Sequence, residues 1–99
     1  MSYEFNKNSK AIKEEILDKY GYLFCQRCKR SSSFKWETHH LIYRSEAPKH
    51  PNLHHPLNLF FCCGECHQFF HKKKSNRNPI VKERKLYLLF PEIKSLNEN

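Results

Sequence analysis

The first periodic run of apolar residues lies close to the N-terminus. Charged residues separate its members, which recur at helical spacing: Ile12, Ile16, Leu17 and Tyr20. This spacing predicts a helix over residues 9–20. Asn8 or Ser9 is a suitable N-cap, and Gly21 stands where a left-handed C-cap residue is expected.

The centre of the chain predicts the order strand, loop, strand, helix. Residues 34–43 read FKWETHHLIY, in which aromatic and β-branched residues partly alternate with polar ones, as in a strand. Residues 44–56 carry three of the five prolines and few apolar residues, which predicts a loop. The apolar run LNLFFC at 57–62 predicts a second strand. Residues 63–66 then form a turn and residues 67–74 a helix.

The pattern of the C-terminal part is less regular. Asn78-Pro79 marks a turn or the start of a helix. The segment IVKERKLYLLF at 80–90 predicts a helix. Leu86, Leu88 and Phe90 alternate as strand residues do, so a strand is the alternative.

Composition limits this chain to a small folded unit. Its 99 residues are enough for one domain, so we expect residues 1–99 to fold as a single unit. Apolar residues make up 38% of the chain and aromatic residues 14%, which favours a packed core over disorder. A core this small gains considerably from a bound metal.

The charge of the chain favours a polyanionic partner. Lys and Arg number 18 against 10 Asp and Glu, a formal net charge of +8. We therefore expect nucleic acid, in first place DNA with RNA left open, as the partner. An anionic membrane is the rival, but no apolar run approaches the roughly 18 residues that a spanning helix needs. The start MSYEFNKNSK lacks the apolar region of a secretory signal, so we expect a cytoplasmic protein.

Four of the five cysteines form two C-x-x-C pairs. The pairs are Cys25/Cys28 and Cys63/Cys66, with 34 residues between them. An odd cysteine count and the expected reducing compartment argue against a disulfide framework. Four thiolates at this spacing predict a structural Zn²⁺ site whose binding is coupled to folding. A redox pair or ordinary buried cysteines are the alternatives, and Cys62 is predicted to be a buried core thiol.

The seven histidines suggest a second metal site. His67 and His71 are four residues apart on a predicted helix and so share a face, where His39 can join them if the helix packs on the strands. His39 and His40 are adjacent on a strand, so their side chains point to opposite sides. One of the two is therefore better placed as a metal ligand and the other as a base that takes a proton from water.

The segments THHL, LNLFFC and CGECHQFFH together resemble the motif of the HNH endonucleases. Those enzymes have a D/H-H pair, an Asn-Leu before a strand and a C-x-x-C-H that opens a helix; the resemblance covers about residues 25–71. It implies an α+β fold with a small ββα-metal (His-Me finger) core at residues 22–74, stapled by the four-cysteine structural zinc. A helix at 9–20 and an extension at 78–99 would flank this core.

The same resemblance implies roles for individual residues. His40 matches the general base, and Asn58 matches the asparagine that holds the strands and orients the base through a hydrogen bond. His39 and His67 match ligands of one catalytic divalent cation, for which Mg²⁺, Mn²⁺, Ni²⁺ and Zn²⁺ are all candidates. His71 stands where the nuclease colicins carry a further ligand, although many relatives have none there.

Basic residues near these motifs are the expected contacts to the nucleic-acid backbone. They are Arg44, Lys49, Lys72, Lys73, Lys74 and Arg77. The function expected from the resemblance is metal-dependent hydrolysis of DNA phosphodiesters. The alternative is a non-catalytic, zinc-stapled nucleic-acid-binding module, which would need the cysteines and the charge but neither His40 nor Asn58. The number of subunits stays open.

Overall fold

Helices surround a small sheet in the computed structural model of this chain, which describes residues 3–33 and 35–97. The helices are α1 (Tyr3–Tyr20), α2 (Gly64–Lys72) and α3 (Asn78–Glu83), and the strands are β1 (Trp36–His40) and β2 (Leu59–Cys63). Within the described residues the two strands form one antiparallel sheet, and short 3₁₀ turns link the later elements. The protein is an α+β domain, as the sequence predicted.

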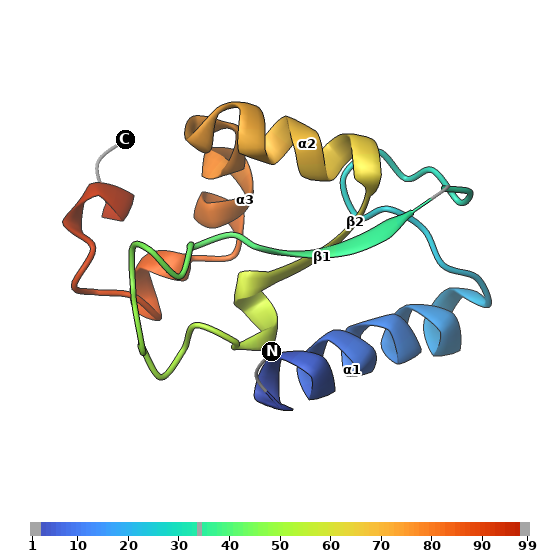
Figure 1. Cartoon of the computed structure of the whole chain (residues 1–99), viewed down its shortest axis with the longest axis horizontal. Coiled ribbons are helices and arrows are strands. Elements are labelled where there is room, and N and C mark those ends of the chain that lie inside the picture. The colour runs from blue at the N-terminus through green and yellow to red at the C-terminus, as the bar shows by residue number, and fades with distance from the viewer. Residues whose placement is uncertain (1–2, 34, 98–99) are drawn as a thin grey trace.

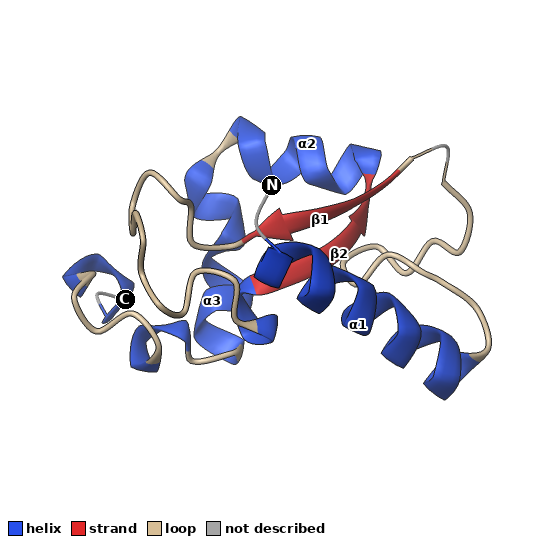
Figure 2. Cartoon of the chain, turned by 60° about the horizontal axis from the view of Figure 1, so that its bottom comes forward, coloured by secondary structure: helices blue, strands red, loops and turns tan. Residues whose placement is uncertain are grey.

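The sheet lies between two helices. Figure 1 shows α2 along one side of the strands and α1 along the other, with α3 beyond the end of α2. The same layering is visible from below, where α1 passes in front of the sheet and α2 lies behind it (Figure 2). Strand pairing runs from Trp36 opposite Cys63 to His40 opposite Leu59. Because neighbouring strand residues face opposite sides, His39 is directed to α2 and His40 to α1.

The N-terminal helix is longer than its apolar pattern predicted. It starts at Tyr3, six residues before the predicted start at Ser9, so the prediction of Asn8 or Ser9 as N-cap is wrong. Both residues lie within α1: the Asn8 side chain donates to the carbonyl of His54 at 2.7 Å, and the Ser9 hydroxyl pairs with that of Thr38 at 2.6 Å. These contacts stabilise the first turns of α1, in which apolar residues do not recur at helical spacing. The predicted C-cap is confirmed, since Gly21 has φ of +80°.

Both strands are shorter or shifted relative to their predicted ranges. β1 ends at His40 because the next two residues turn to Asn58: the Leu41 amide donates to its backbone carbonyl and the Ile42 amide to its side chain. Residue 34, the predicted first residue of this strand, is outside the described residues. β2 begins at Leu59 because Pro56–Asn58 form a 3₁₀ turn, capped by the side chain of His55.

The later helices begin and end elsewhere than predicted. α2 begins at Gly64, so residues 63–66 are its entrance and first turn, and it ends at Lys72 instead of Lys74. The predicted helix over 80–90 is correct only for residues 80–83, which belong to α3. Lys85 adopts φ of +54° and interrupts it before a short 3₁₀ turn at Leu86–Leu88.

The core gathers beneath α2 and α3. Its largest fully buried side chains include Phe61, Phe70, Phe90, Leu41, Ile42 and Leu86. Cys62 is also fully buried, as predicted, and burial raises the pKa of its thiol. Among the described helices, none has the length and apolar character that crossing a bilayer requires.

Candidate metal sites and histidine cleft

The two C-x-x-C pairs meet in space. The sulfur atoms of Cys25, Cys28, Cys63 and Cys66, hereafter the cysteine cluster, all lie within 4.8 Å of one another. The Cys28 and Cys63 sulfurs are 3.8 Å apart, which matches the edge of about 3.8 Å expected for a tetrahedron with zinc–sulfur bonds of about 2.3 Å. All four cysteines are free of disulfides. The cluster can therefore hold a metal such as zinc.

Gln26 pairs with β2 as a neighbouring strand residue would, and so brings the Cys25/Cys28 pair (the first knuckle) to the Cys63/Cys66 pair (the second knuckle). Gln26 donates its backbone amide to the Phe61 carbonyl and accepts the Phe61 amide with its side-chain oxygen, both at 2.9 Å. Gln26 thus extends the ladder beyond the outer edge of β2. The knuckle closes through Lys29, which adopts φ of +67° and donates its amide to the Cys25 carbonyl. This role of Gln26 was not predicted from the sequence, because the pairing is long-range and a single glutamine carries no periodic signal.

The surroundings of the cysteine cluster shift the pKa values of its thiols in different directions. Burial by itself would raise the pKa of Cys25, but the backbone amides of Cys28, Cys63 and Arg27 direct hydrogen bonds toward its sulfur and bring that pKa down to about 7. Burial raises the pKa of Cys66, although the Arg27 guanidinium donates to its sulfur at 3.4 Å. One thiol is thus disposed to ionise near neutrality, and filling the cluster with a metal would release the remaining protons.

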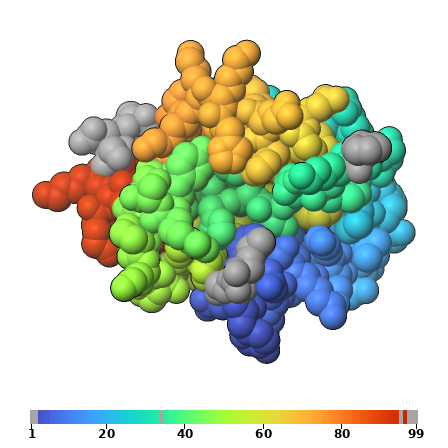
Figure 3. Space-filling model, viewed as in Figure 1, coloured from blue at the N-terminus to red at the C-terminus, as the bar shows by residue number. Residues whose placement is uncertain are grey.

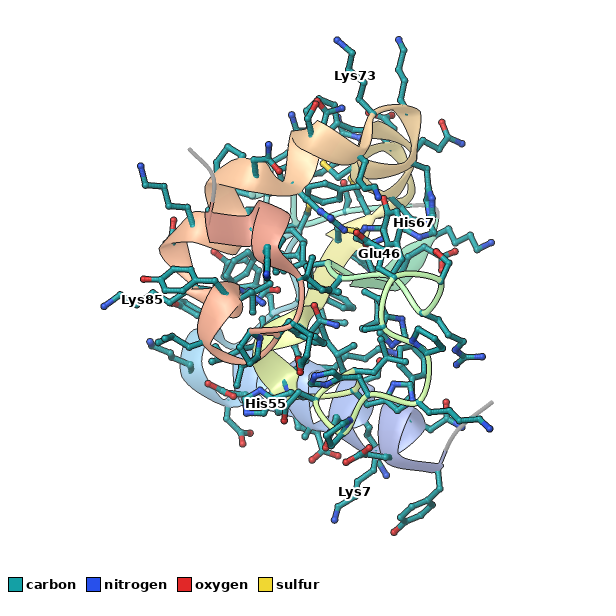
Figure 4. All side chains as sticks on the ribbon, turned by 90° about the vertical axis from the view of Figure 1, so that its left-hand side faces the viewer. Lys7, Glu46, His55, His67, Lys73 and Lys85 are labelled. Carbon is teal, nitrogen blue, oxygen red and sulfur yellow. The ribbon has the colours of Figure 1, made fainter. Side chains whose placement is uncertain are left out.

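Three histidines from β1 and α2 form the second group. The ligand atoms of His39, His67 and His71, hereafter the histidine triad, lie within 4.8 Å of one another, and the Nε2 atoms of His67 and His71 are 3.1 Å apart. The helical spacing of four residues and the alternation of β1 explain this meeting. Figure 4 labels His67, which stands on α2 close to the loop that carries Glu46.

His39 lies at the buried end of the triad. Its ring stacks on Phe70 with centroids 5.1 Å apart, Tyr43 meets its edge, and only 3% of the residue is exposed. Its Nε2 atom is buried and has no hydrogen-bond partner among the described residues. A buried polar atom without a partner is costly, and a metal bound by the triad would satisfy it.

The same surroundings favour the neutral form of two of these imidazoles, His39 and His67. Burial, followed by the nearby His67 and His71, lowers the pKa of His39 to about 3, and burial also lowers the pKa of His67. A neutral imidazole has the free lone pair that a metal ligand needs. Three imidazole donors, two of them favoured in the neutral form, therefore fit a divalent cation.

The triad opens into a cleft of about 370 Å³, hereafter the histidine cleft. Its walls include all three triad residues together with Thr38, His40, Tyr43, Arg44 and Ser45. A larger cavity of about 590 Å³ lies between α1 and α3, but no histidine or cysteine is among the described residues that line it. The histidine triad and His40 thus lie at the smaller cavity.

His40 faces the opposite side of β1 from His39, as the sequence predicted. Its Nε2 lies 3.0 Å from Nδ1 of His54, and the Phe5 ring stacks on its imidazole with centroids 4.9 Å apart. Burial, followed by the charges of His54 and Arg44, lowers the pKa of His40 to about 4. His54 belongs to the loop predicted over residues 44–56, and no local sequence pattern pairs it with His40.

Asn58 is fully buried and its side chain is completely engaged. Its oxygen accepts the Ile42 amide at 2.7 Å, and its nitrogen donates to the carbonyls of Ile42 at 3.1 Å and Leu53 at 2.8 Å. These bonds join the residues that follow His40 to the residue that precedes His54. Asn58 therefore bonds to backbone near both His40 and His54, and the described hydrogen bonds include none between the Asn58 and His40 side chains.

Of the basic residues predicted to contact nucleic acid, some are exposed and free of ion pairs among the described residues, and others pair with Glu46. Arg44 and Lys49 are exposed on the loop, and Lys72 and Lys73 are exposed at the end of α2. Figure 4 shows Lys73 pointing away from the molecule, and the segment after α2 projects side chains beyond the surface at the top of Figure 3. Lys74 is exposed but pairs with Glu46 at 3.2 Å.

Arg77 is the one basic residue of this predicted set that is buried. It is 5% exposed, its guanidinium forms a two-pronged ion pair with Glu46, and it donates to the Leu41 carbonyl at 2.7 Å. This arrangement ties the loop after β1 to the segment after α2. We therefore assign Arg77 to the support of the histidine cleft and not to its surface.

Comparisons of this chain with protein-family models, with curated proteins and with solved structures found no match. We therefore infer the function from the geometry of the cysteine cluster, the histidine triad and the histidine cleft.

Proposed function

We propose that this protein is a metal-dependent endonuclease of the HNH type, with a ββα-metal core formed by β1, β2 and α2. The observation that carries the proposal is one juxtaposition: the histidine triad and His40 line the same cleft, although the side chains of His39 and His40 leave β1 on opposite faces. A metal-ligand set and a separate neutral imidazole within one cavity are what hydrolysis by an activated water requires.

The cysteine cluster would hold a structural zinc. It ties the segment after α1 to the start of α2, and α2 carries two of the three triad histidines. Three observations support this assignment: the distance between the non-bonded sulfur atoms of Cys28 and Cys63, the absence of disulfides among these thiols and the lowered pKa of Cys25. Zinc would therefore stabilise the fold and fix the position of the triad without taking part in chemistry.

The reaction divides between the chain and a bound cation. A divalent cation on the histidine triad would supply positive charge against the attacked phosphate. His40 accepts a proton from water while the water oxygen forms its bond to phosphorus. The bond from phosphorus to the 3′ oxygen breaks, and that oxygen leaves with the electron pair and takes a proton from solvent. The products carry 5′ phosphate and 3′ hydroxyl ends.

Exposed cations beside the cleft would bind the phosphate backbone. Arg44 lines the cleft itself, Lys49 follows on the same loop, and Lys72 and Lys73 extend from the end of α2. Lys74 would contribute less because Glu46 already neutralises part of its charge. Such contacts position nucleic acid without reading its sequence, so we expect modest sequence preference and strong weakening by salt.

A plasmid-nicking assay tests the proposal. The zinc-loaded protein is incubated with supercoiled DNA at low salt in Mg²⁺, Mn²⁺, Ni²⁺ or EDTA, beside His40→Ala and the control His50→Ala. His50 lies outside the histidine cleft and pairs with Glu92 at 2.9 Å. We expect metal-dependent nicking by the wild type and the control, and its loss in His40→Ala with fold and zinc content preserved.

The opposite result has a definite meaning. If the wild type binds DNA but cuts it with none of these metals, the endonuclease proposal is overturned. The chain would then be the non-catalytic, zinc-stapled binding module.

A further inference from the structure

The His40–His54 pair joins two residues that the chain separates by a proline-bearing loop. The two nitrogen atoms lie 3.0 Å apart, within ordinary hydrogen-bond distance, and the ring centroids are 5.1 Å apart. A contact between two neutral imidazoles has one donor and one acceptor, so the pair must choose between two tautomeric arrangements.

Two separate elements hold His54 in this position. From α1, Asn8 donates to the His54 carbonyl at 2.7 Å, and Phe5 packs its ring edge-on against the His54 imidazole at 5.8 Å. From the turn before β2, Asn58 donates to the carbonyl of Leu53 at 2.8 Å. The pairing is therefore built into the fold by long-range contacts and is not a chance approach of two surface side chains.

The Phe5 ring defines the chemical surroundings of the pair. It stacks on His40 with an interplanar angle of 23°, so one face of that imidazole is covered by an apolar ring. The hydrogen bond to His54 engages Nε2 of His40, a residue that lines the histidine cleft, and leaves Nδ1 as its other ring nitrogen. Only Nδ1 of His40 is then free to meet a water molecule.

We propose that His54 is a positioning residue that fixes His40 as the tautomer with a proton on Nε2 and the lone pair on Nδ1. His40 donates from Nε2 to Nδ1 of His54, and Nδ1 of His40 is available to accept the proton of the attacking water. In the reverse arrangement, Nδ1 of His40 would carry the proton and the only lone pair would point at His54. This inference rests on the proposed function, and it makes α1 part of the site.

The same arrangement acts after proton transfer. Once Nδ1 of His40 has accepted its proton, the ring is an imidazolium whose Nε2 proton still points at the lone pair of His54. A hydrogen bond from a charged donor is stronger than one from a neutral donor, so the pair strengthens as charge develops on His40. His54 neither touches the phosphate nor binds the cation, and its effect passes entirely through His40.

Kinetics of three variants test this inference. His54→Leu keeps much of the side-chain volume but has no acceptor, whereas His54→Gln offers an amide oxygen to His40. His55→Gln is the control, since His55 lies in the same loop and its side chain accepts the Leu57 amide instead. We expect His54→Leu to lower kcat by about 10- to 100-fold with KM unchanged, the scale found when the partner orienting a functional histidine is removed. His54→Gln should recover most of the rate, and His55→Gln should retain it.

Nitrogen-15 NMR of the histidine side chains reads the tautomer directly, without turnover. We expect His40 in the zinc-loaded wild type to show a protonated Nε2 and an unprotonated Nδ1, and His54→Leu to show a mixture. A proton on Nδ1 of His40 overturns the inference, as does full kcat in folded His54→Leu. Failure of the wild type to cut DNA with any metal overturns the proposed function, and is recognised because wild type and variants are then equally inactive.

Discussion

Replacing Asn58 with alanine should destabilise this domain more than any comparable change at an asparagine. Asn58 is fully buried, and its side chain satisfies the amide of Ile42 and the carbonyls of Ile42 and Leu53. Each buried backbone group left without a partner costs about 1–3 kcal/mol, so the upper bound is about 9 kcal/mol. Water entering the vacated space would satisfy some of these groups, which brings the expected cost to about 3–5 kcal/mol.

Two further variants separate hydrogen bonding from volume. Asn76→Ala is the matched control, because the Asn76 side chain donates one bond to the Phe69 carbonyl at 2.7 Å and is only partly buried; it should cost about 1 kcal/mol. Asn58→Asp keeps the size and the acceptor for Ile42 but turns a carboxylate oxygen toward two carbonyls. We expect it to be at least as unstable as Asn58→Ala.

Urea unfolding of the zinc-loaded proteins, followed by circular dichroism at pH 7 and fixed zinc concentration, measures these costs. A typical domain has about 5–15 kcal/mol of total stability, so a loss of about 3–5 kcal/mol is readily seen. The reasoning is refuted if Asn58→Ala costs no more than Asn76→Ala, or if Asn58→Asp is as stable as the wild type.

Three other predictions concern the metal, the buried ion pair and the surface charge. Chelation of the cysteine cluster should abolish most of the folded circular-dichroism signal, whereas Cys62→Ser should bind as much zinc by mass spectrometry as the wild type; an unchanged signal in chelator contradicts this. Burying the Glu46 carboxylate would raise its pKa, but the hydrogen bonds and charge of Arg77, the Tyr43 amide and the Lys74 ammonium together lower it from 4.5 to about 2, so Glu46→Gln should cost up to about 3 kcal/mol at pH 7. Since this pKa is lower in the folded state, the stabilisation is complete above pH 4.5 and is lost as pH falls toward 2; a Tm difference between the two proteins that stays constant down to pH 3 would disprove it. Replacing Lys72 and Lys73 with Gln should weaken DNA binding about equally for unrelated sequences and reduce the salt slope by about 2 in fluorescence anisotropy, and an unchanged slope would remove them from the interface.

The sequence alone determined those features that depend on local spacing. Two C-x-x-C pairs identify a four-cysteine cluster, because each pair fits one knuckle and four sulfurs complete a tetrahedron. The separation of four residues between His67 and His71 places them on one helix face, and strand alternation sends His39 and His40 to opposite sides. These periodicities hold wherever the helix and the strand form, so the membership of both candidate metal groups could be predicted.

Only the tertiary structure decided which distant segments meet. The first turns of α1 are held by bonds from Asn8 and Ser9 to residues far along the chain, so no local period announced them. Nothing in the local sequence distinguishes Arg77 from the exposed lysines before it, yet Arg77 pairs with Glu46 and is buried. Such outcomes depend on how loops close and on which buried charge finds a partner, and neither is encoded in spacing.

The partner of His40 shows the same division most clearly. Alternation along β1 determined that His40 faces away from the triad, but nothing in the loop pattern distinguishes His54 from His50 or His55. The choice was made by Asn8, Asn58 and Phe5, which reach the loop from α1 and from the turn before β2. The candidate metal ligands and His40 can thus be predicted from the sequence. The contacts that would orient them exist only once a helix, a loop and a turn pack together.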